Sequence, residues 1–551
     1  MIFRLSLALA ALTALAPGTA LAQDRDTVRG RALVLLERAA PGASASARSA
    51  VRASASAVIA RHGLRRARPD VPAVGVSTVR IPPGDSVAAL RRRLAGDPRV
   101  AAVEPEARHR LRVVPNDPAL SAGDPSIGDV FQWYLHRQGF PAAWDLSRGA
   151  GAVVGIIDSG IDSAHPDLAT KVKSAHDHDG NTVGTADEVG HGTHVSSLAC
   201  GAPDNAFGIA GAGLDCQVVL EKSDLTGSSV IASLVDATDM GAGVINMSFG
   251  GGRLSAGEMR ALRYALRKDV VLIAAAADQP IADQGHPAKD LQPTGTGRRI
   301  SEGKGLVVTA ADPSGGRASF AGRGSQISLA AMGDSGTRGG GIFAAFPANP
   351  TQIETGGSNP PGPPCTTCRT VFNGDSRFAY LAGTSMASPQ VAGAVALVRA
   401  ANPRLRRAGV VRIMKQTATR AAGASGWTTE LGWGILNAGA AVQRAVQFAS
   451  DTVAPRTSRR GGRSRSVNRR FTLKWRGRDQ APPGVAPAGI EAYSIYEKRG
   501  RKYKLIATTT STRYRLRGRK GKRYRFAVRA RDLAGNLEPT RRASFVIRVR
   551  R

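Results

Sequence analysis

Residues 152–161 read AVVGIIDSGI, an apolar run that ends in an acidic residue and a Ser-Gly pair. A continuous apolar run bounded by a turn signal is typical of a strand buried on both faces, as in a parallel sheet. Ser159-Gly160 ends the run, so Asp158 stands at the carboxyl end of the predicted strand. Ligands of open α/β sheets bind at this edge, which makes Asp158 the first candidate for a functional side chain.

The flanking sequence continues as alternating strands and helices. From Gln132 onward, glycine-rich turns separate the segments, as a parallel α/β sheet requires. The predicted strands span residues 152–157, 217–221, 243–247, 270–276 and 305–310. The predicted helices span residues 191–198, 228–240, 255–268 and 385–401. Between Asp334 and Asp375 a Gly/Pro-rich insert shows little periodicity, which predicts a long surface loop.

Two further candidates stand at predicted helix starts. His191 lies in GHGTHV, and Ser385 lies in GTSMASP at a glycine turn that opens a long apolar helix. Peptide hydrolysis by a serine needs a base against the hydroxyl, an acid that orients the base, and donors for the developing oxyanion. Taken singly, each residue has a structural explanation as a turn, a buried core histidine or a helix cap. Together, in the order Asp, His, Ser, they follow the order of the subtilisin triad.

The sequence blocks around these residues resemble the subtilase family. They are GIIDSGID at 155–162, GHGTHVSSLA at 190–199, VINMSFGG at 244–251 and LAGTSMASPQVAGAVAL at 381–397, and the resemblance covers residues 115–445. It implies that Ser385 is the nucleophile, that His191 is general base and then acid, and that Asp158 orients His191. It also implies that Ser248, Phe249 and Gly250 form a strand that pairs with the extended backbone of a protein or peptide substrate.

One position departs from the family pattern. The oxyanion-hole residue of subtilases is normally an Asn in a segment like AAAGN, whereas VVLIAAAADQ at 270–279 places Ala277 at the glycine and Asp278 at the asparagine. An ionised Asp278 would repel the oxyanion, so it must be protonated, point away or be offset by a neighbour. Some proprotein convertases and the sedolisins also carry Asp there, so Asp is compatible with activity. The backbone N–H of Ser385 remains an oxyanion donor.

The resemblance also implies a structural calcium site. Ca²⁺ binds six to eight hard oxygens. The expected ligands are the side chains of Asp117, Asp167 and Asn205 and the carbonyls of Phe207 and Ile209. A second acidic group (Asp177, Asp179 and Asp187) is a weaker candidate, because acidic loops are usually just solvated. No organic cofactor is expected.

The N-terminus has the pattern of an export signal, residues 1–22. Arg4 gives a positive start, residues 5–15 form an apolar run, and Ala20-Leu21-Ala22 offers a cleavage site. The run is too short to span a bilayer. We therefore expect a secreted, extracellular protein.

Residues 23–112 predict a small α+β module. Its expected elements are strands at 31–37, 74–81 and 100–103 and a helix at 85–94 with Asp85 at its N-cap. Through DPRVAAVEPE at 97–106 the module resembles the inhibitor-type propeptide of subtilases. The resemblance implies that this propeptide assists folding, plugs the active-site cleft of its own enzyme and is cut off by it.

After the peptidase domain, expected at 113–450, the composition becomes strongly basic. Residues 451–551 hold 30 Lys/Arg against 6 Asp/Glu, whereas residues 111–450 hold 28 of each sign. Residues 451–470 predict a linker, and short strands within residues 471–551 predict an all-β sandwich that resembles fibronectin type III or Ig-like modules. So basic a domain should attract polyanions, such as anionic wall polymers, and we expect a monomer.

The four cysteines of an exported chain favour structural disulfides. Cys200 and Cys216 bracket a glycine-rich stretch, and Cys365 and Cys368 can pair only through a tight local loop. Two disulfides are expected, with the connectivity open.

Three functions remain for the whole chain. The first is a general secreted endopeptidase, and the second is a selective processing protease. The third is a surface-binding protein in which the basic domain carries the function and the peptidase domain has weak activity or none.

Overall fold

The computed structural model describes residues 27–37, 45–107, 114–180, 184–292, 297–300, 303–337, 340–356, 364–462, 464–539 and 543–550. The chain divides into two compact units, Met1–Leu111 and Arg112–Arg551. The expected export signal, residues 1–22, lies outside the described residues.

The first unit is an α+β module with one antiparallel sheet of order β2-β3-β1-β4. Its elements are β1 (Thr27–Leu36), α1 (Ala45–Arg61), β2 (Arg65–Arg66), η1 (Pro72–Val74), β3 (Val76–Arg80), α2 (Val87–Leu94) and β4 (Val100–Ala107). Ser86, rather than Asp85, caps α2, because its hydroxyl accepts the N–H of Ala89 at 3.1 Å. Helix α1 was not predicted, although its buried residues Val51, Ala55 and Val58 follow the helical period.

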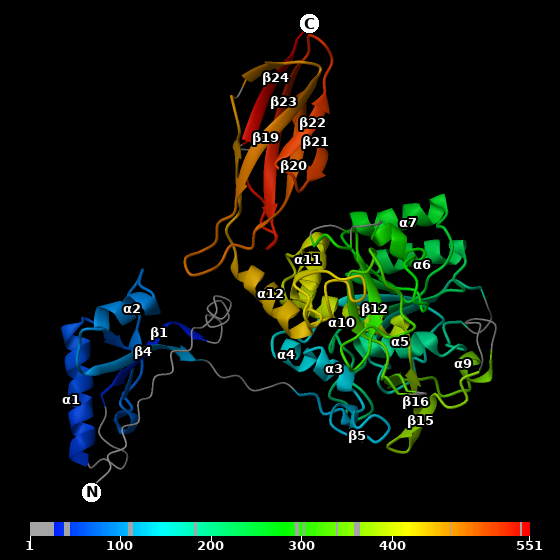
Figure 1. The fold of residues 1–551 in the computed structure, drawn as a ribbon, viewed down its shortest axis with the longest axis horizontal. Helices are drawn as coiled ribbons and strands as arrows, with labels where there is room; N and C mark the ends of the chain where they lie inside the picture. Colours follow the sequence, from blue (N-terminus) through cyan, green and yellow to red (C-terminus); the bar gives the residue numbers. More distant parts are fainter. Residues whose placement is uncertain are drawn as a thin grey trace. The chain divides into compact units, whose positions relative to one another are not determined.

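The second unit is built on a seven-stranded sheet of order β13-β12-β11-β10-β7-β9-β8, in which every pairing is parallel (Figure 1). The strands are β7 (Val153–Asp158), β8 (Val172–Asp177), β9 (Gln217–Lys222), β10 (Val244–Met247), β11 (Val271–Ala275), β12 (Leu306–Ala311) and β13 (Leu329–Met332). The sequence predicted five of them; β8, with partly exposed residues, and the short β13 were missed.

Helices cover both faces of this sheet. Helices α5 (His191–Cys200) and α10 (Thr384–Ala401) pack with one apolar core, and α6 (Gly227–Asp239) and α7 (Ala256–Arg267) pack with the other. In β7, Val154 and Ile156 belong to the first core and Ile157 to the second. Since side chains alternate along a strand, Asp158 is directed to the face that α5 covers. All four helices were predicted within two residues of their ends.

The remaining elements of the domain are short, except for two helices that come after the main sheet in the sequence. They are η2 (Pro118–Leu120), β5 (Gly123–Asp124), β6 (Asp129–Val130), α3 (Trp133–Arg137), α4 (Phe140–Trp144), α8 (Ala288–Leu291), α9 (Gln352–Thr355), α11 (Arg407–Thr417) and α12 (Ala438–Ser450). Among the described residues no helix is both long and apolar enough to cross a membrane.

The Gly/Pro-rich insert is more ordered than the sequence suggested. It contributes β14 (Ile342–Ala345) and β15 (Arg369–Phe372), which pair on either side of β16 (Asp375–Leu381) in an antiparallel sheet. Phe343 and Phe346 are fully buried, and the rings of Phe343 and Phe378 stack with centroids 5.2 Å apart. The prediction of a surface loop was wrong for these strands, because two short apolar runs are hidden among the turn residues.

The C-terminal part is an eight-stranded β-sandwich. One sheet has the order β17-β19-β22 and the other β18-β24-β23-β20-β21. The strands are β17 (Arg456–Arg459), β18 (Ser464–Val467), β19 (Arg470–Arg478), β20 (Ile490–Arg499), β21 (Lys502–Thr509), β22 (Arg513–Arg517), β23 (Arg523–Asp532) and β24 (Ala543–Val549). Strands β17 and β18 fall inside the segment expected to be a linker, so that expectation was wrong: Thr457 is buried and belongs to the sandwich.

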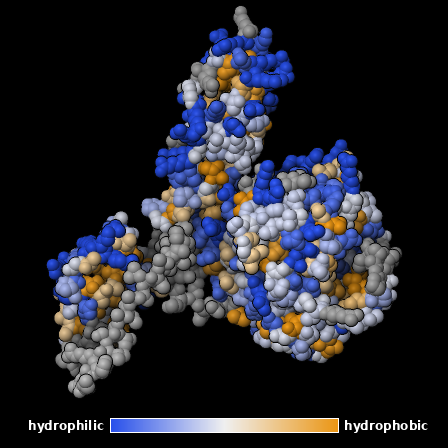
Figure 2. Space-filling model, viewed as in Figure 1, coloured by the Kyte–Doolittle hydropathy of each residue, from blue (hydrophilic) through white to orange (hydrophobic). Residues whose placement is uncertain are grey.

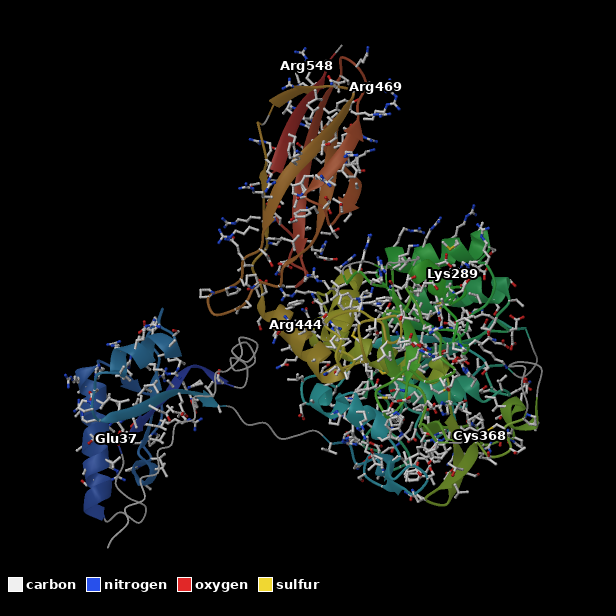
Figure 3. The ribbon with its side chains drawn as sticks, viewed as in Figure 1. Glu37, Lys289, Cys368, Arg444, Arg469 and Arg548 are labelled. Atoms are coloured by element: carbon white, nitrogen blue, oxygen red, sulfur yellow. A yellow bond between two sulfur atoms is a disulfide. The ribbon has the colours of Figure 1, made fainter. Side chains whose placement is uncertain are left out.

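Hydrophilic residues dominate much of the visible surface of this sandwich (Figure 2). Arg469 and Arg548 are both exposed, and their side chains lie at the end of the sandwich that carries the C-terminus (Figure 3). Inside, Leu473, Trp475, Ile495 and Val528 are completely buried. The alternation of buried apolar and exposed basic side chains is that of a sandwich with two solvated outer faces.

Candidate active site

Asp158 and His191 are joined by a short hydrogen bond. The Nδ1 atom of His191 lies 2.7 Å from Oδ1 of Asp158. Asp158 ends β7 and is 5% exposed, and its Oδ1 also accepts the N–H of Ser159 at 2.8 Å. The carboxylate is thus fixed at the end of a buried strand, and it holds the imidazole with Nδ1 as the donor, which leaves Nε2 free to accept a proton.

Gly190 and Asp187 fix the start of α5. Gly190 has a φ of +93°, and a Cβ there would lie 2.6 Å from the ring of Phe346. Asp187 caps the helix: its carboxylate accepts the N–H groups of Gly190 at 2.8 Å and Thr193 at 2.7 Å. It also accepts the Ser159 hydroxyl at 2.8 Å. The residue at the N-cap position itself is Gly190, so the usual capping pattern does not mark Asp187 in the sequence.

Ser385 is the second residue of α10. Its hydroxyl donates to the carbonyl of Ser248 at 3.1 Å, while the hydroxyl of Ser248 donates to the carbonyl of Ser385 at 3.0 Å. The hydroxyl of Ser388 lies 2.8 Å from that of Ser248. These hydrogen bonds therefore hold the start of α10 against the segment after β10. Rotation about the Cα–Cβ bond of Ser385 would turn its hydroxyl away from the carbonyl of Ser248.

Asp278 also contacts the start of α10. Its Oδ1 accepts the N–H of Thr384 at 2.8 Å, and its Oδ2 lies 3.3 Å from the place that a Cβ on Gly383 would occupy. Burial raises the pKa of Asp278, although the hydrogen bonds from Thr384 and the charge of His191 oppose the rise. A carboxyl that points away from the site does not fit this contact.

These groups line one open cavity of about 760 Å³. Its walls include all the residues expected at the catalytic, oxyanion and substrate-binding positions, namely Asp158, His191, Ser248, Phe249, Gly250, Asp278 and Ser385. The cavity lies where β7, β9, β10 and β11 end, so the parallel sheet gathers at its carboxyl edge residues that are more than 200 positions apart in sequence.

The electrostatics of the cavity favour a charged imidazole. Burial alone would lower the pKa of His191, but the charge and hydrogen bond of Asp158 outweigh it, with help from Asp187 and Asp278, and the pKa is raised. Three carboxylates thus stabilise the imidazolium that would form if His191 took up a proton.

The residues expected to bind calcium come together in a second place. Asp117 and Asp167 are 1% and 0% exposed. The Oδ1 of Asp117 is buried without a hydrogen-bond partner. Asp167 accepts from Nδ2 of Asn205 at 2.9 Å and from the N–H of Ile209 at 3.0 Å. Phe207 donates its N–H to Oδ1 of Asn205 at 2.8 Å.

Both carboxyls of this second place are electrostatically strained. Burial, together with the charge of Asp117, raises the pKa of Asp167 to about 7, and burial also raises the pKa of Asp117. A Cβ on Gly208 would collide with Oδ2 of Asp167, so only glycine lets the loop close on the carboxylate. An unpartnered buried oxygen and two buried carboxyls fit a hard divalent cation.

The weaker acidic group already has other partners. The ammonium of Lys222, whose side chain is 3% exposed, lies 3.6 Å from Oδ2 of Asp179. Asp187 is engaged at the start of α5. A lysine therefore supplies the positive charge near Asp179, where a second calcium ion would have to bind.

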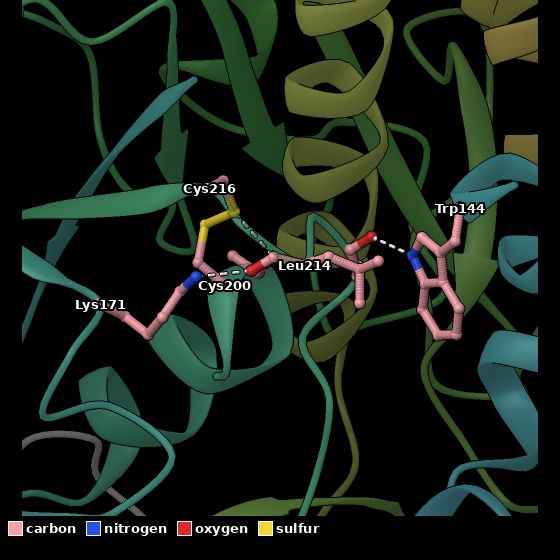
Figure 4. The surroundings of a disulfide bond; sticks show 7 residues. Trp144, Lys171, Cys200, Leu214 and Cys216 are labelled. Atoms are coloured by element: carbon pink, nitrogen blue, oxygen red, sulfur yellow. Dashed lines mark hydrogen bonds between the residues drawn. A yellow bond between two sulfur atoms is a disulfide. The ribbon is translucent and has the colours of Figure 1, made fainter. Parts of the chain in front are cut away.

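The cysteines agree with one of the two expected disulfides. Cys200, the last residue of α5, is bonded to Cys216 before β9, with Cα atoms 5.5 Å apart (Figure 4). The intervening loop is also held by Trp144, which donates to the carbonyl of Ala212 at 3.1 Å. Cys365 and Cys368 are free thiols, so the expected second disulfide is not present. The thiol of Cys368 instead donates to the carbonyl of Cys365 at 3.1 Å.

The comparisons with known proteins point to one family. Residues 149–434 match the Subtilase family. Thermitase of Thermoactinomyces vulgaris is 30% identical over 289 residues, 52% of this chain and 85% of that protein. Subtilisin DY of Bacillus licheniformis is 31% identical over 305 residues, 54% of this chain and 92% of that protein. An extracellular protease of Xanthomonas campestris pv. campestris is 30% identical over 406 residues, 65% of this chain and 61% of that protein.

The family match spans the sheet, the cavity at its carboxyl edge and the candidate residues Asp158, His191 and Ser385. The chain therefore belongs to the subtilase family and is a subtilisin-like serine peptidase.

Proposed function

We propose that this peptidase is a secreted endopeptidase, made as a self-processed zymogen, in which Asp158, His191 and Ser385 form the catalytic triad. The observation that carries the proposal is the 2.7 Å contact between His191 Nδ1 and Asp158 Oδ1, in a cavity that Ser385 also lines.

The proposed reaction is acyl transfer to Ser385 followed by hydrolysis. The hydroxyl of Ser385 breaks its hydrogen bond to the carbonyl of Ser248. Its oxygen then attacks the scissile carbonyl carbon and its proton passes to Nε2 of His191. Asp158 holds the Nδ1–H and stabilises the imidazolium. His191 then returns the proton to the leaving amine, and a water molecule deprotonated by His191 releases the acid and restores Ser385.

The oxyanion would meet the backbone N–H of Ser385 and the side chain of Asp278. Only a protonated Asp278 can donate a hydrogen bond there, and its raised pKa supports such a state at the acidic end of the working range. Ser248, Phe249 and Gly250 line the cavity beside Ser385 and would pair with the substrate backbone as an added strand.

A calcium ion would be held by Asp117, Asp167, Asn205 and the carbonyls of Phe207 and Ile209. It would supply structural stability by neutralising the two buried carboxylates, and it takes no part in the reaction. The buried, unpartnered Oδ1 of Asp117 supports this site.

The N-terminal unit would act as the inhibitor-type propeptide. Its compactness as a separate unit, ending at Leu111, supports this role. The name of the extracellular Xanthomonas relative supports export.

The sandwich, which resembles a fibronectin type III or Ig-like module, would bind an anionic surface polymer. Arg513, Arg515 and Arg517 are all exposed on β22, and in the register with β19 Arg517 faces Arg470 and Arg513 faces Lys474. Like charges directly opposite one another repel, and a bound polyanion would relieve that repulsion. Retention on a heparin column should fall when the three β22 arginines become Gln, but not when the exposed Arg260, Arg263 and Arg267 of α7 do.

One experiment distinguishes the proposed peptidase from the alternative, a surface-binding protein with a weak or inactive peptidase domain. The wild type and Ser385→Ala are expressed in a host lacking other secreted proteases, and the products are weighed by mass spectrometry. The wild type should lose its N-terminal unit and start between Ala107 and Pro115, while Ser385→Ala should accumulate as the precursor. Ser121→Ala, at an exposed serine, is the matched control. Normal maturation of Ser385→Ala would refute the triad.

A further inference from the structure

Four metal-ligating side chains gather at the ends of β8 and β9, at the edge of the main sheet. His176 lies near the end of β8, His178 follows that strand, Glu221 lies on β9 and Asp236 lies on α6. Ligand atoms of His176, Glu221 and Asp236 all lie within 4.8 Å of one another. None of the four residues lines the cavity, so the group is separate from the candidate active site.

The fold explains why these residues converge. His176 and Glu221 are direct partners in the register between β8 and β9, and His178 lies two positions further along the same face. Glu221 shares the side of β9 with Val219, which packs in the core under α6 and α7. Asp236 reaches the group from α6, which packs on β9. The edge strand, its neighbour and the covering helix therefore each contribute ligands.

The charges in this group are not balanced by a basic side chain. The side chain of Glu221 is 0% exposed, and Asp236 is close to the same imidazole. Among the residues that the structure describes, the ion pairs of both carboxylates involve only His176 and His178. The neighbouring Lys222 is directed to Asp179 on the other side of the strand. His176, Glu221 and Asp236 thus cluster closely, and His178 joins them through its contacts with both carboxylates; no lysine or arginine of the described residues pairs with these carboxylates.

Two of the contacts have the length expected between neighbouring ligands of a tetrahedral metal ion. With bonds of about 2.0–2.2 Å, two ligand atoms of tetrahedral zinc lie about 3.4 Å apart. The Nδ1 of His176 is 3.3 Å from Oε1 of Glu221, and the Nε2 of His178 is 3.5 Å from Oδ2 of Asp236. The Nε2 of His178 lies 2.7 Å from Oε2 of Glu221, which is a hydrogen-bond distance. If both atoms bound the same ion, this distance would have to increase by about 0.7 Å.

We propose that His176, His178, Glu221 and Asp236 form a site for a divalent transition-metal ion of the zinc class. Imidazole and carboxylate ligands together suit such an ion better than Ca²⁺, which prefers oxygen alone. The side chains of His176 and Asp236 are 32% and 43% exposed, which gives the ion a path from solvent. The ion would clamp the edge strand β8 to β9 and α6.

The test is metal binding by the full chain, carried as Ser385→Ala so that it is not digested. The protein is stripped with EDTA, returned to excess Ca²⁺ to fill oxygen-only sites, and titrated with Zn²⁺ against a chromophoric chelator. We expect one Zn²⁺ per chain, a rise in the thermal midpoint, and visible d–d absorption when Co²⁺ replaces Zn²⁺. The double variant His176→Gln/His178→Gln and the single variant Asp236→Asn should bind more than about 100-fold more weakly.

The matched control is His286→Gln, which removes a histidine 2.6 Å from the Asp290 carboxylate outside the group and should bind Zn²⁺ as the parent does. Zn²⁺ binding that persists in the double histidine variant but disappears in His191→Gln would place the ion at the active site and overturn the proposal. No stoichiometric Zn²⁺ in the parent, with circular dichroism showing a folded chain, would leave only a hydrogen-bonded group and would also overturn it.

Discussion

Oδ1 of Asp278 accepts the backbone N–H of Thr384 at 2.8 Å, one residue before Ser385. This contact places a carboxyl at the N-terminus of α10, where the helix dipole favours the ionised form, while burial raises its pKa and favours the neutral form. The balance between the two decides whether Asp278 donates to an oxyanion or repels it.

Asp278→Asn should therefore raise kcat. With its Oδ1 still accepting from Thr384, the Asn would place an NH₂ donor where Oδ2 stands now. An added oxyanion donor is worth about 10²–10³ in kcat, and we expect at least about 10-fold with KM little changed. The gain should be largest at alkaline pH, where the wild-type carboxyl is ionised, so the alkaline limb of the pH profile should disappear.

The acid limb should move only to the extent that Asp278 is ionised there. His191 must be neutral to act as a base, and the charge of an ionised Asp278 raises the pKa of His191, so removing that charge extends activity to lower pH. Profiles of kcat and kcat/KM with a peptide substrate check both limbs. Asp283→Asn, an exposed acid of the same cavity, is the control. A variant slower than the wild type at every pH would show that Asp278 is not an oxyanion donor.

Calcium removal should speed heat inactivation, because an ion bound only by the folded state stabilises it by mass action. In EDTA the wild type should lose activity on heating as fast as the Asp167→Asn variant does. The inactivation rate of that variant should be the same with and without Ca²⁺. Asp129→Asn, at an exposed acid, should keep the calcium response. Equal wild-type rates in excess Ca²⁺ and in EDTA would exclude the Asp117/Asp167 site.

Loss of the Cys200–Cys216 disulfide should destabilise the catalytic domain. A cross-link that closes a loop of this length stabilises by about 3 kcal/mol. Urea unfolding of Cys200→Ala/Cys216→Ala, in the Ser385→Ala background, should show a loss of that order. Cys365→Ala removes a free thiol and is the control. Equal losses in the two variants would mean that packing, rather than the cross-link, is responsible.

The main sheet could be predicted because its strands are buried on both faces and read as unbroken apolar runs, as in β7 and β11. Strand β8 lies at the edge of the sheet and is only half-buried, so its residues KSAHD carry no such signal. In the insert, the apolar run around Phe343 is too short to distinguish a strand from a turn without its partner β16. Short segments thus depend on pairings that a local pattern does not encode.

The same limit applies to the site. Asp158, His191 and Ser385 stand in blocks with sharp local context, so a search of the sequence finds them. The contacts between the blocks could not be found in this way: Thr384 donates to Asp278 across 106 positions, and Ser248 contacts Ser385 across 137. Asp187 was assigned to an acidic loop because only its neighbours in sequence were visible.

Asp187 provides the last prediction. Its carboxylate accepts the N–H groups of Gly190 and Thr193 and the hydroxyl of Ser159, so it both caps α5 and supports the pKa of His191. In Asp187→Asn one of these donors would face an NH₂ group, and the mismatch should cost about 1–3 kcal/mol of stability. Because one of the charges that raise the pKa of His191 is lost, the acid limb of kcat/KM should also shift to lower pH.

The control separates these two effects. Glu258 completes the capping box at the start of α7, where its carboxylate accepts the N–H of Ser255 at 2.7 Å. Glu258→Gln should therefore lower the midpoint of urea unfolding without moving the acid limb, because this helix packs on the other face of the sheet from α5. A purely structural Asp187 would behave in the same way as Glu258. An unshifted acid limb in Asp187→Asn would thus reduce Asp187 to a helix cap, whereas a shift together with lowered stability would establish it as a positioning residue for His191.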